Sequence, residues 1–130
     1  MINEKLNKDI LDLINENTNE ITKIKRKILW TNTNPTNIFA SQTITLSESL
    51  DNYEYYEILF KQTNINARTM TTGKIPVGYG TILSWNTSIN MYRPTETTVS
   101  GNTISFEDGK TTNGVDNSTT IPIKVIGHKA

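Results

Sequence analysis

The chain has 130 residues, no cysteine and a formal net charge of zero, because 13 Lys and Arg residues balance 13 Asp and Glu residues. The balanced charge predicts no basic face of the kind that nucleic acids or anionic membranes bind, so we expect neither partner. The sequence has no apolar run near the ~20 residues of a membrane span and no signal-peptide pattern, so we expect no membrane insertion. Disulfides and thiolate metal sites are excluded.

The first predicted element is a helix with a heptad repeat over residues 6–28. Its seam has isoleucine at both repeating positions with one polar layer between them, and comprises Ile10, Ile14, Asn17, Ile21, Ile24 and Ile28. Isoleucine at both positions favours three or four strands over two, and a single buried Asn fixes the register. We therefore expect residues 1–28 to form the coiled-coil trimerisation stalk of a parallel homotrimer.

An amphipathic helix packed on its own domain would show the same period, and this alternative stays open. The polar run at 15–20 argues against it, because a globular core tolerates six consecutive polar residues badly. In a thin coiled coil most of that run faces water. A helix of ~23 residues would be only marginally stable alone in water, so something must bury its apolar seam.

Residues 29–130 are rich in Thr and Asn, which favours strands and turns over helices. Pro35, in the polar segment that follows Trp30, bars continuation of the helix and places the junction between stalk and head here. Strands are expected at 39–46, 53–61, 81–85, 88–93, 97–100, 103–107 and 121–126, with a weaker one at 64–72 and a turn at 47–52. The alternation in 53–61 predicts that Tyr56, Ile58 and Phe60 face the core.

Two features bear on strand order. The turn at Gly101 and Asn102 predicts a hairpin of 97–100 with 103–107, in which Val99, Ile104 and Phe106 face inward. Pro122 lacks a ladder donor, so it predicts an edge strand or the first position of a strand. Seven or eight strands at about 8–12-residue spacing predict a mainly β fold, an antiparallel β-sandwich or jelly roll.

The sequence holds little that points to catalysis. His128 is the single histidine and no Ser or Cys forms a believable triad with it. Carboxylate pairs such as Glu107 with Asp108 could serve a glycosidase, but acids beside turn residues are ordinary. The loop at 108–117 has oxygen ligands for calcium yet lacks the EF-hand spacing. We expect no enzyme activity, no metal and no cofactor.

Aromatic side chains in the head are better candidates for binding. Tyrosine rings stack on the CH faces of sugars while Thr and Asn donate hydrogen bonds, although the same rings could fill the core. Long polar loops at 72–80 and 108–119, with 94–96 next, are where a rigid β scaffold concentrates binding groups. A coil at one end of the head leaves the opposite loops to face a host surface. We expect the ligand-binding residues to be Tyr79, Tyr92, Asp108, Asn113 and Asp116.

Three stretches of the head carry a resemblance: LWTNTNPTNIFASQTITL from Leu29, YEYYEILFK from Tyr53 and IPIKVIGHK from Ile121. Over residues 29–130 the chain resembles the C-terminal head modules of tail-fibre and baseplate proteins from phages of low-GC Gram-positive bacteria and their prophages. The resemblance implies a trimeric head at the end of a fibrous stalk, located on the virion and in contact with other tail proteins. Longer members have more fibre before the head, so this chain is either a fragment or a small stand-alone module.

The expected function is therefore that of a receptor-binding head that recognises a polysaccharide or wall glycan on the host cell. A structural fibre cap or decoration protein with no ligand is the main alternative. A carbohydrate-active enzyme of the same β architecture is the weaker one, because no acid pair stands out.

Overall fold

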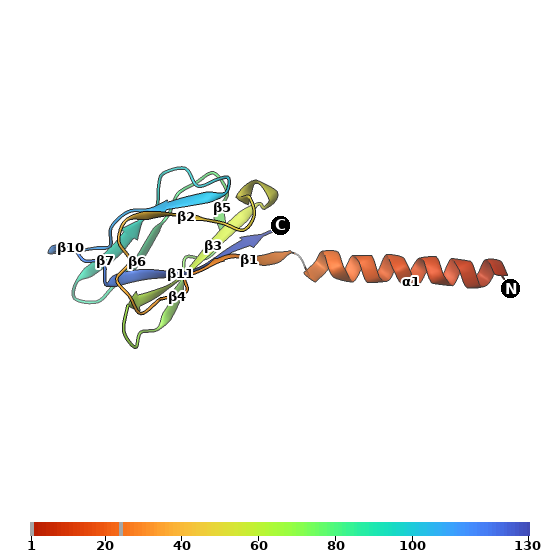
Figure 1. The fold of residues 1–130 in the computed structure, drawn as a ribbon, viewed down its shortest axis with the longest axis horizontal. Coiled ribbons are helices and arrows are strands. Elements are labelled where there is room, and N and C mark those ends of the chain that lie inside the picture. Colours follow the sequence, from red (N-terminus) through yellow and green to blue (C-terminus); the bar gives the residue numbers. More distant parts are fainter. Residues whose placement is uncertain (1, 24) are drawn as a thin grey trace.

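The computed structural model describes the backbone of residues 2–23 and 25–130, and the side chains of 3–17 and 25–130. One helix, α1 (Ile2–Lys23), extends from one end of a head built of antiparallel sheets (Figure 1). The fold is mainly β with a single N-terminal helix among the described residues, as the sequence predicts. No helix in the described ranges combines the length and hydrophobicity that crossing a membrane requires.

The helix ends at Lys23, so the prediction that it continues through Ile28 is wrong. Ile28 lies in β1 (Arg26–Thr31), where it pairs with Ile126. The β-branched and aromatic side chains of this segment suit a pleated strand, and pairing with the head outweighs the heptad pattern. Ile28 is therefore a strand residue and not part of a helical seam. Ile24 and the side chain of Ile21 lie outside the described residues.

The largest sheet has the strand order β1-β11-β3-β4, and β5 pairs beside β4 on β3. Its strands after β1 are β3 (Tyr55–Thr63), β4 (Thr69–Thr71), β5 (Ile75–Pro76) and β11 (Thr119–His128). β11 begins at Thr119 and lies between β1 and β3, so the prediction that Pro122 marks an edge strand or a first position is wrong for the strand as a whole. The ladder of β11 with β1 ends at Lys124, so Pro122 itself pairs with β3 alone. The ladder of β11 with β3 shifts register between Pro122 and Lys124, and such a bulge accommodates a residue without an N–H.

Two smaller sheets complete the head, with the orders β10-β9-β7-β6 and β2-β8. Their strands are β2 (Gln42–Thr45), β6 (Ile82–Asn86), β7 (Asn90–Pro94), β8 (Thr103–Phe106), β9 (Lys110–Thr111) and β10 (Gly114–Val115). The turn predicted at 47–52 contains the short 3-10 helix η1 (Leu50–Asn52), capped by the Ser49 side chain.

The predicted hairpin of 97–100 with 103–107 is wrong. β8 pairs with β2 instead, in a register that sets Ile104 opposite Ile44. Residues 97–100 belong to no strand, and their carbonyls accept hydrogen bonds from the loop before β6. The predicted turn at Gly101 is present, with a φ of +69°, but β8 pairs with the distant strand β2 and not with the segment just before the turn.

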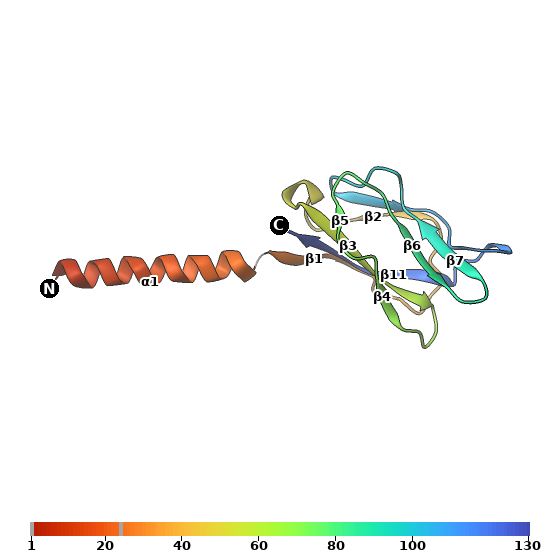
Figure 2. The same cartoon turned by 180° about the vertical axis from the view of Figure 1, so that it is seen from behind.

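A single apolar core joins the three sheets. Tyr56, Ile58 and Phe60 of β3 are buried in it, and so are Val99, Ile104 and Phe106, all as predicted. The core comprises Leu29, Phe39, Ile44, Leu46, Leu50, Tyr53, Tyr56, Ile58, Phe60, Leu83, Val99, Ile104, Phe106, Ile121 and Val125. Helix α1 and the C-terminus lie at one end of this head, while β10 lies at the other (Figures 1 and 2).

Candidate functional site

Tyr79 lies at the centre of a tight Gly78-Tyr79-Gly80 turn between β5 and β6. Gly78 has φ of +101°, a conformation that side-chain-bearing residues rarely adopt. The N–H groups on either side of the tyrosine are both used, since Gly78 donates to the Val99 carbonyl at 2.7 Å and Gly80 donates to the Thr97 carbonyl at 3.0 Å. The turn is therefore fixed against the 97–99 segment.

The backbone of Tyr79 itself is also anchored. Its carbonyl accepts a hydrogen bond of 2.6 Å from the hydroxyl of Tyr56, whose pKa is raised by burial. Gly80 approaches Glu96 so closely that a Cβ would lie 2.0 Å from the Glu96 carbonyl oxygen, which only glycine permits. Tyr79 nevertheless remains 67% exposed. An aromatic residue whose backbone is fixed and whose side chain is left in solvent is suited to contact a ligand.

The ring forms one wall of a shallow depression of about 350 Å³, which we call the Tyr79 groove. Its lining combines apolar, hydroxyl and carboxylate side chains, and its exposed surface is mostly apolar. The lining residues are Tyr79, Gly80, Thr81, Ile82, Pro94, Thr95, Glu96, Thr97 and Glu107. Ile82 is 56% exposed and adds apolar surface beside the ring. Sequence reasoning predicted Tyr79 as a ligand residue and named 94–96 as a further candidate loop, but it did not predict that they share one groove with Ile82 and Glu107, which tertiary packing brings together.

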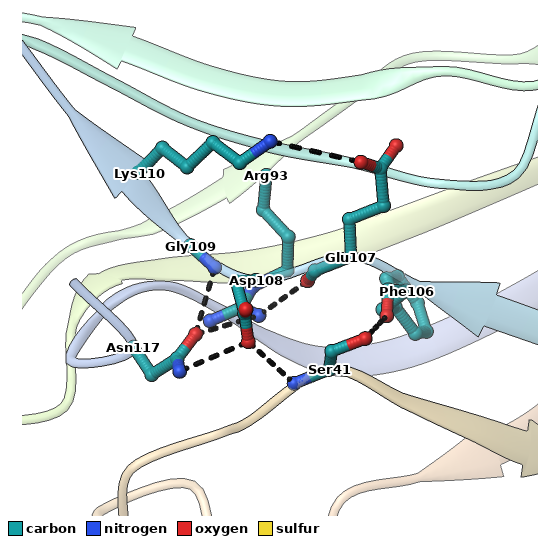
Figure 3. Close-up of polar contacts among 8 residues, drawn as sticks. All are labelled: Ser41, Arg93, Phe106, Glu107, Asp108, Gly109, Lys110 and Asn117. Atoms are coloured by element: carbon teal, nitrogen blue, oxygen red, sulfur yellow. Dashed lines mark hydrogen bonds and ion pairs between the residues drawn. The ribbon is translucent and has the colours of Figure 1, made fainter. Parts of the chain in front are cut away.

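Glu107 and Asp108 are adjacent in sequence but extend in different directions (Figure 3). Glu107 extends toward Lys110, with 3.7 Å between its Oε1 and the lysine Nζ. Asp108 Oδ1 accepts hydrogen bonds from the Ser41 N–H at 3.0 Å and the Asn117 side chain at 3.1 Å. The Ser41 contact, followed by that of Asn117, lowers the pKa of Asp108. Asp108 thus serves the internal structure of the head, while Glu107 faces the groove.

Arg93 lies behind this network and is fully buried. Its guanidinium donates to the carbonyls of Thr120 at 2.9 Å, Glu107 at 2.8 Å and Thr119 at 3.2 Å, and it lies 5.2 Å from the centroid of the Phe39 ring. Burial lowers the pKa of Arg93 to about 10, so the side chain remains charged at neutral pH. This arginine is a structural tie among β7, β11 and the residue after β8.

The structure does not bring the five predicted ligand residues together. None of Tyr92, Asp108, Asn113 and Asp116 lines the Tyr79 groove. Asn113 and Asp116 flank β10, at the end of the head farthest from α1 (Figure 1). Tyr92 is half-buried within β7, opposite Ser84 and Lys110.

In the loop at 108–117, which was considered as a calcium site, the carboxylate oxygens of Asp108 and Asp116 already accept hydrogen bonds from within the head. Asp116 Oδ1 accepts hydrogen bonds from the backbone and hydroxyl of Ser118, and Asp108 is engaged as described above. Among the described residues there is no group of three or more His, Cys, Asp or Glu side chains arranged to hold a metal ion.

A second depression, of about 480 Å³, lies between β1 and β2 and is lined by residues 30–34, 37–39 and 42–44. None of its lining residues is charged. Several of its amides already bond within the chain, since Asn32 donates to the Pro122 carbonyl and Gln42 to the Ala40 carbonyl. This depression was not predicted, since Trp30 and the run of Asn and Thr are its only signals in the sequence.

His128 and Glu57 form a further polar contact, between β11 and β3, that sequence reasoning missed. His128 is 7% exposed and its Nε2 lies 2.8 Å from Glu57 Oε1. Glu57 also accepts a hydrogen bond from the Thr71 hydroxyl. The Thr71 bond, and after it the His128 contact, lower the pKa of Glu57 from its ordinary value of 4.5.

Glu57 is therefore expected to make stability depend on acid pH. Because its pKa is lower in the folded chain than in the unfolded one, its contribution is fully present above about pH 4.5 and is lost as pH falls through the folded pKa. Replacing Glu57 by Gln should destabilise the head at pH 7 and reduce the difference in urea midpoint between pH 7 and pH 3. The exposed neighbour Glu54, replaced by Gln, should leave the parent's difference unchanged. An undiminished difference in Glu57→Gln would contradict this assignment.

No protein-family model matches the chain, and no curated protein matches it.

Proposed function

We propose that the chain is the trimeric head of a phage tail-fibre or baseplate protein, and that the Tyr79 groove binds a glycan on the host cell surface. The observation that carries the glycan site is Tyr79, which stays 67% exposed although the backbone on both sides of it is fixed. A flat aromatic face beside apolar surface matches the CH face of a sugar ring. Carboxylates and hydroxyls around it match sugar hydroxyls.

The proposal of a trimer rests on the surface of α1. Leu6, Ile10 and Leu13 recur at steps of four and three residues, which places them along one side of the helix, and they are 55%, 49% and 56% exposed. Ile14 and Asn17 continue this stripe in sequence. A helix of this length gains little stability alone in water, so copies of the same chain are the natural partners for the stripe. Leu13 was not among the predicted seam residues, and its exposure makes the stripe wider than an isoleucine seam.

Three copies would strengthen a weak glycan site. A parallel coil would hold three heads side by side, and linked sites raise apparent affinity through effective concentration without any new contact. For the head itself we propose a β-sandwich, in which the five-stranded sheet packs across the common core from the two smaller sheets. On this proposal the protein belongs to the virion, joined to other tail proteins.

The first test replaces Tyr79 by Ala. Loss of the ring is expected to weaken binding to host cells by roughly tenfold or more per site, since stacking and buried apolar area are worth about 1–3 kcal/mol. The melting temperature should stay close to the parent's, because the contacts that fix the turn are made by the backbone. Binding of the fluorescently labelled protein to host cells, with melting followed by circular dichroism, makes the measurement.

Two variants serve as controls. Tyr79→Phe keeps the ring and should bind nearly as the parent does. Tyr55→Ala removes a half-buried tyrosine that does not line the groove, and it should leave cell binding unchanged. If a folded Tyr79→Ala binds as well as the parent, the groove is not the glycan site, and the depression between β1 and β2 becomes the place to test. A parent that binds no host surface at all would favour a structural cap.

A further inference from the structure

The Tyr79 groove carries two carboxylates on one outward face. Thr95 and Phe106 form an antiparallel bridge, and both side chains are buried. Side chains alternate along a strand, so the residues that follow them, Glu96 and Glu107, point outward on the same face. In this register the two glutamates are diagonal neighbours, for which the separation is on the order of 7–8 Å. Both line the groove.

Among the described residues that line the groove, none is basic and could balance these acids. The ion pair of Glu107 with Lys110 is long, at 3.7 Å, and the Glu107 side chain is 53% exposed, so this pair is weak and easily replaced. Glu96 Oε1 accepts a hydrogen bond of 3.3 Å from the Ser105 N–H, which orients its carboxylate. A cation in the groove would gain charge-assisted hydrogen bonds, while a phosphate or uronate would meet two like charges.

We infer that the Tyr79 groove selects a saccharide bearing a free ammonium group, such as an unacetylated hexosamine. This inference rests on the proposed glycan site and adds the charge of its ligand. The Tyr79 ring and Ile82 contact the apolar face of the sugar, and Glu96 and Glu107 receive the ammonium group at its edge. Acetylation of the amine removes the charge and adds bulk, and anionic wall polymers are repelled.

The experiment compares two matched saccharides on the 130-residue parent chain. Oligomers of glucosamine and of N-acetylglucosamine of equal length are titrated at pH 6 by calorimetry. The glucosamine oligomer is expected to bind at least about tenfold more tightly. This preference should shrink as NaCl is raised from 20 to 500 mM, since salt screens exposed charges.

Single substitutions test whether Glu96 and Glu107 cause the preference for the free amine. Glu96→Gln and Glu107→Gln should each reduce the preference for the free amine severalfold while leaving the melting temperature near the parent's. Glu54→Gln removes one negative charge from an exposed position outside the groove and should leave the preference intact. Tyr79→Ala should weaken binding to both oligomers.

The outcomes separate the two proposals. Equal or tighter binding of the acetylated oligomer, lost in Tyr79→Ala, overturns the ammonium inference and keeps the glycan site. Binding of neither oligomer by a parent that attaches to host cells through Tyr79 overturns the ammonium inference alone. A lysine-rich peptide that displaces the glucosamine oligomer at equal concentration overturns selection of a saccharide, because the groove would then recognise any ammonium group.

Discussion

Replacing Arg93 by methionine is expected to lower the free energy of unfolding by about 3–5 kcal/mol, because three main-chain carbonyls would lose the buried donor that they share. Methionine fills much of the volume but donates no hydrogen bond. The carbonyls of Thr119, Thr120 and Glu107 would then lose the donor that pairs them, and each buried group left unpaired costs about 1–3 kcal/mol. Urea denaturation followed by tryptophan fluorescence measures the change.

The Arg93→Lys variant separates the contribution of the positive charge to stability from that of the hydrogen bonds made by the guanidinium. Lysine keeps the positive charge near Asp108 and the Phe39 ring but has a single compact donor group in place of the planar fork, so an intermediate loss of stability is expected. Arg68→Met, at an exposed arginine, should change stability by less than about 0.5 kcal/mol. An Arg93→Met variant as stable as Arg68→Met would show that the network adds little to the head.

Thr120 gives a reason for the size of the Arg93 effect. This β-branched residue has φ of +48° and a buried hydroxyl that makes no hydrogen bond. Backbone conformations of this kind cost about 1–3 kcal/mol and persist only where their surroundings hold them. Two of the three carbonyls that Arg93 pairs belong to Thr119 and Thr120. Loss of the guanidinium should therefore release the start of β11 first, which amide hydrogen exchange in residues 117–121 would reveal.

The local sequence pattern predicted where the strands lie in the chain better than it predicted which strands pair with each other. The alternation of β3 and its buried face follows from period-2 burial, which needs only neighbouring residues. The pairing of β8 with β2 joins residues about sixty positions apart and has no local signal, whereas the turn at Gly101 suggested a nearer partner. Pro122 is tolerated in a central strand by a bulge that only the packed sheet reveals.

The same limit applies to the candidate site. Tyr79 could be proposed from its loop, but the glutamates of the groove come from segments that the Thr95–Phe106 bridge brings together. Arg93 was missed because an arginine in an alternating strand usually marks the solvent face. The available signal was its place in phase with Ile89 and Met91, on the more apolar side of that strand.

Charged substitutions on the apolar stripe of α1 are expected to turn a trimer into a monomer. In the proposed coil, Ile10→Asp with Leu13→Asp would set carboxylates from three chains against one another in a seam that must be dry, and both like-charge repulsion and lost burial oppose assembly. The mass measured by sedimentation equilibrium should fall from three times 14.7 kDa to 14.7 kDa.

The matched control places the same residues on the other face. Lys8 and Asn15 are exposed and lie about half a turn from Ile10 and Leu13 around the helix, so Lys8→Asp with Asn15→Asp should leave the trimer intact. The circular dichroism signal of the head should be the same in both variants, because none of the core residues among the described part of the chain lies in α1. Monomeric heads would each bind through one weak groove, and attachment to host cells should fall by on the order of 10²–10⁴-fold relative to the control.

A parent of monomeric mass at micromolar concentration, or a stripe variant that stays trimeric, would contradict assembly through α1. If a monomeric stripe variant attached to host cells as well as the trimeric control, one head would be sufficient for attachment, because the two variants differ only in avidity.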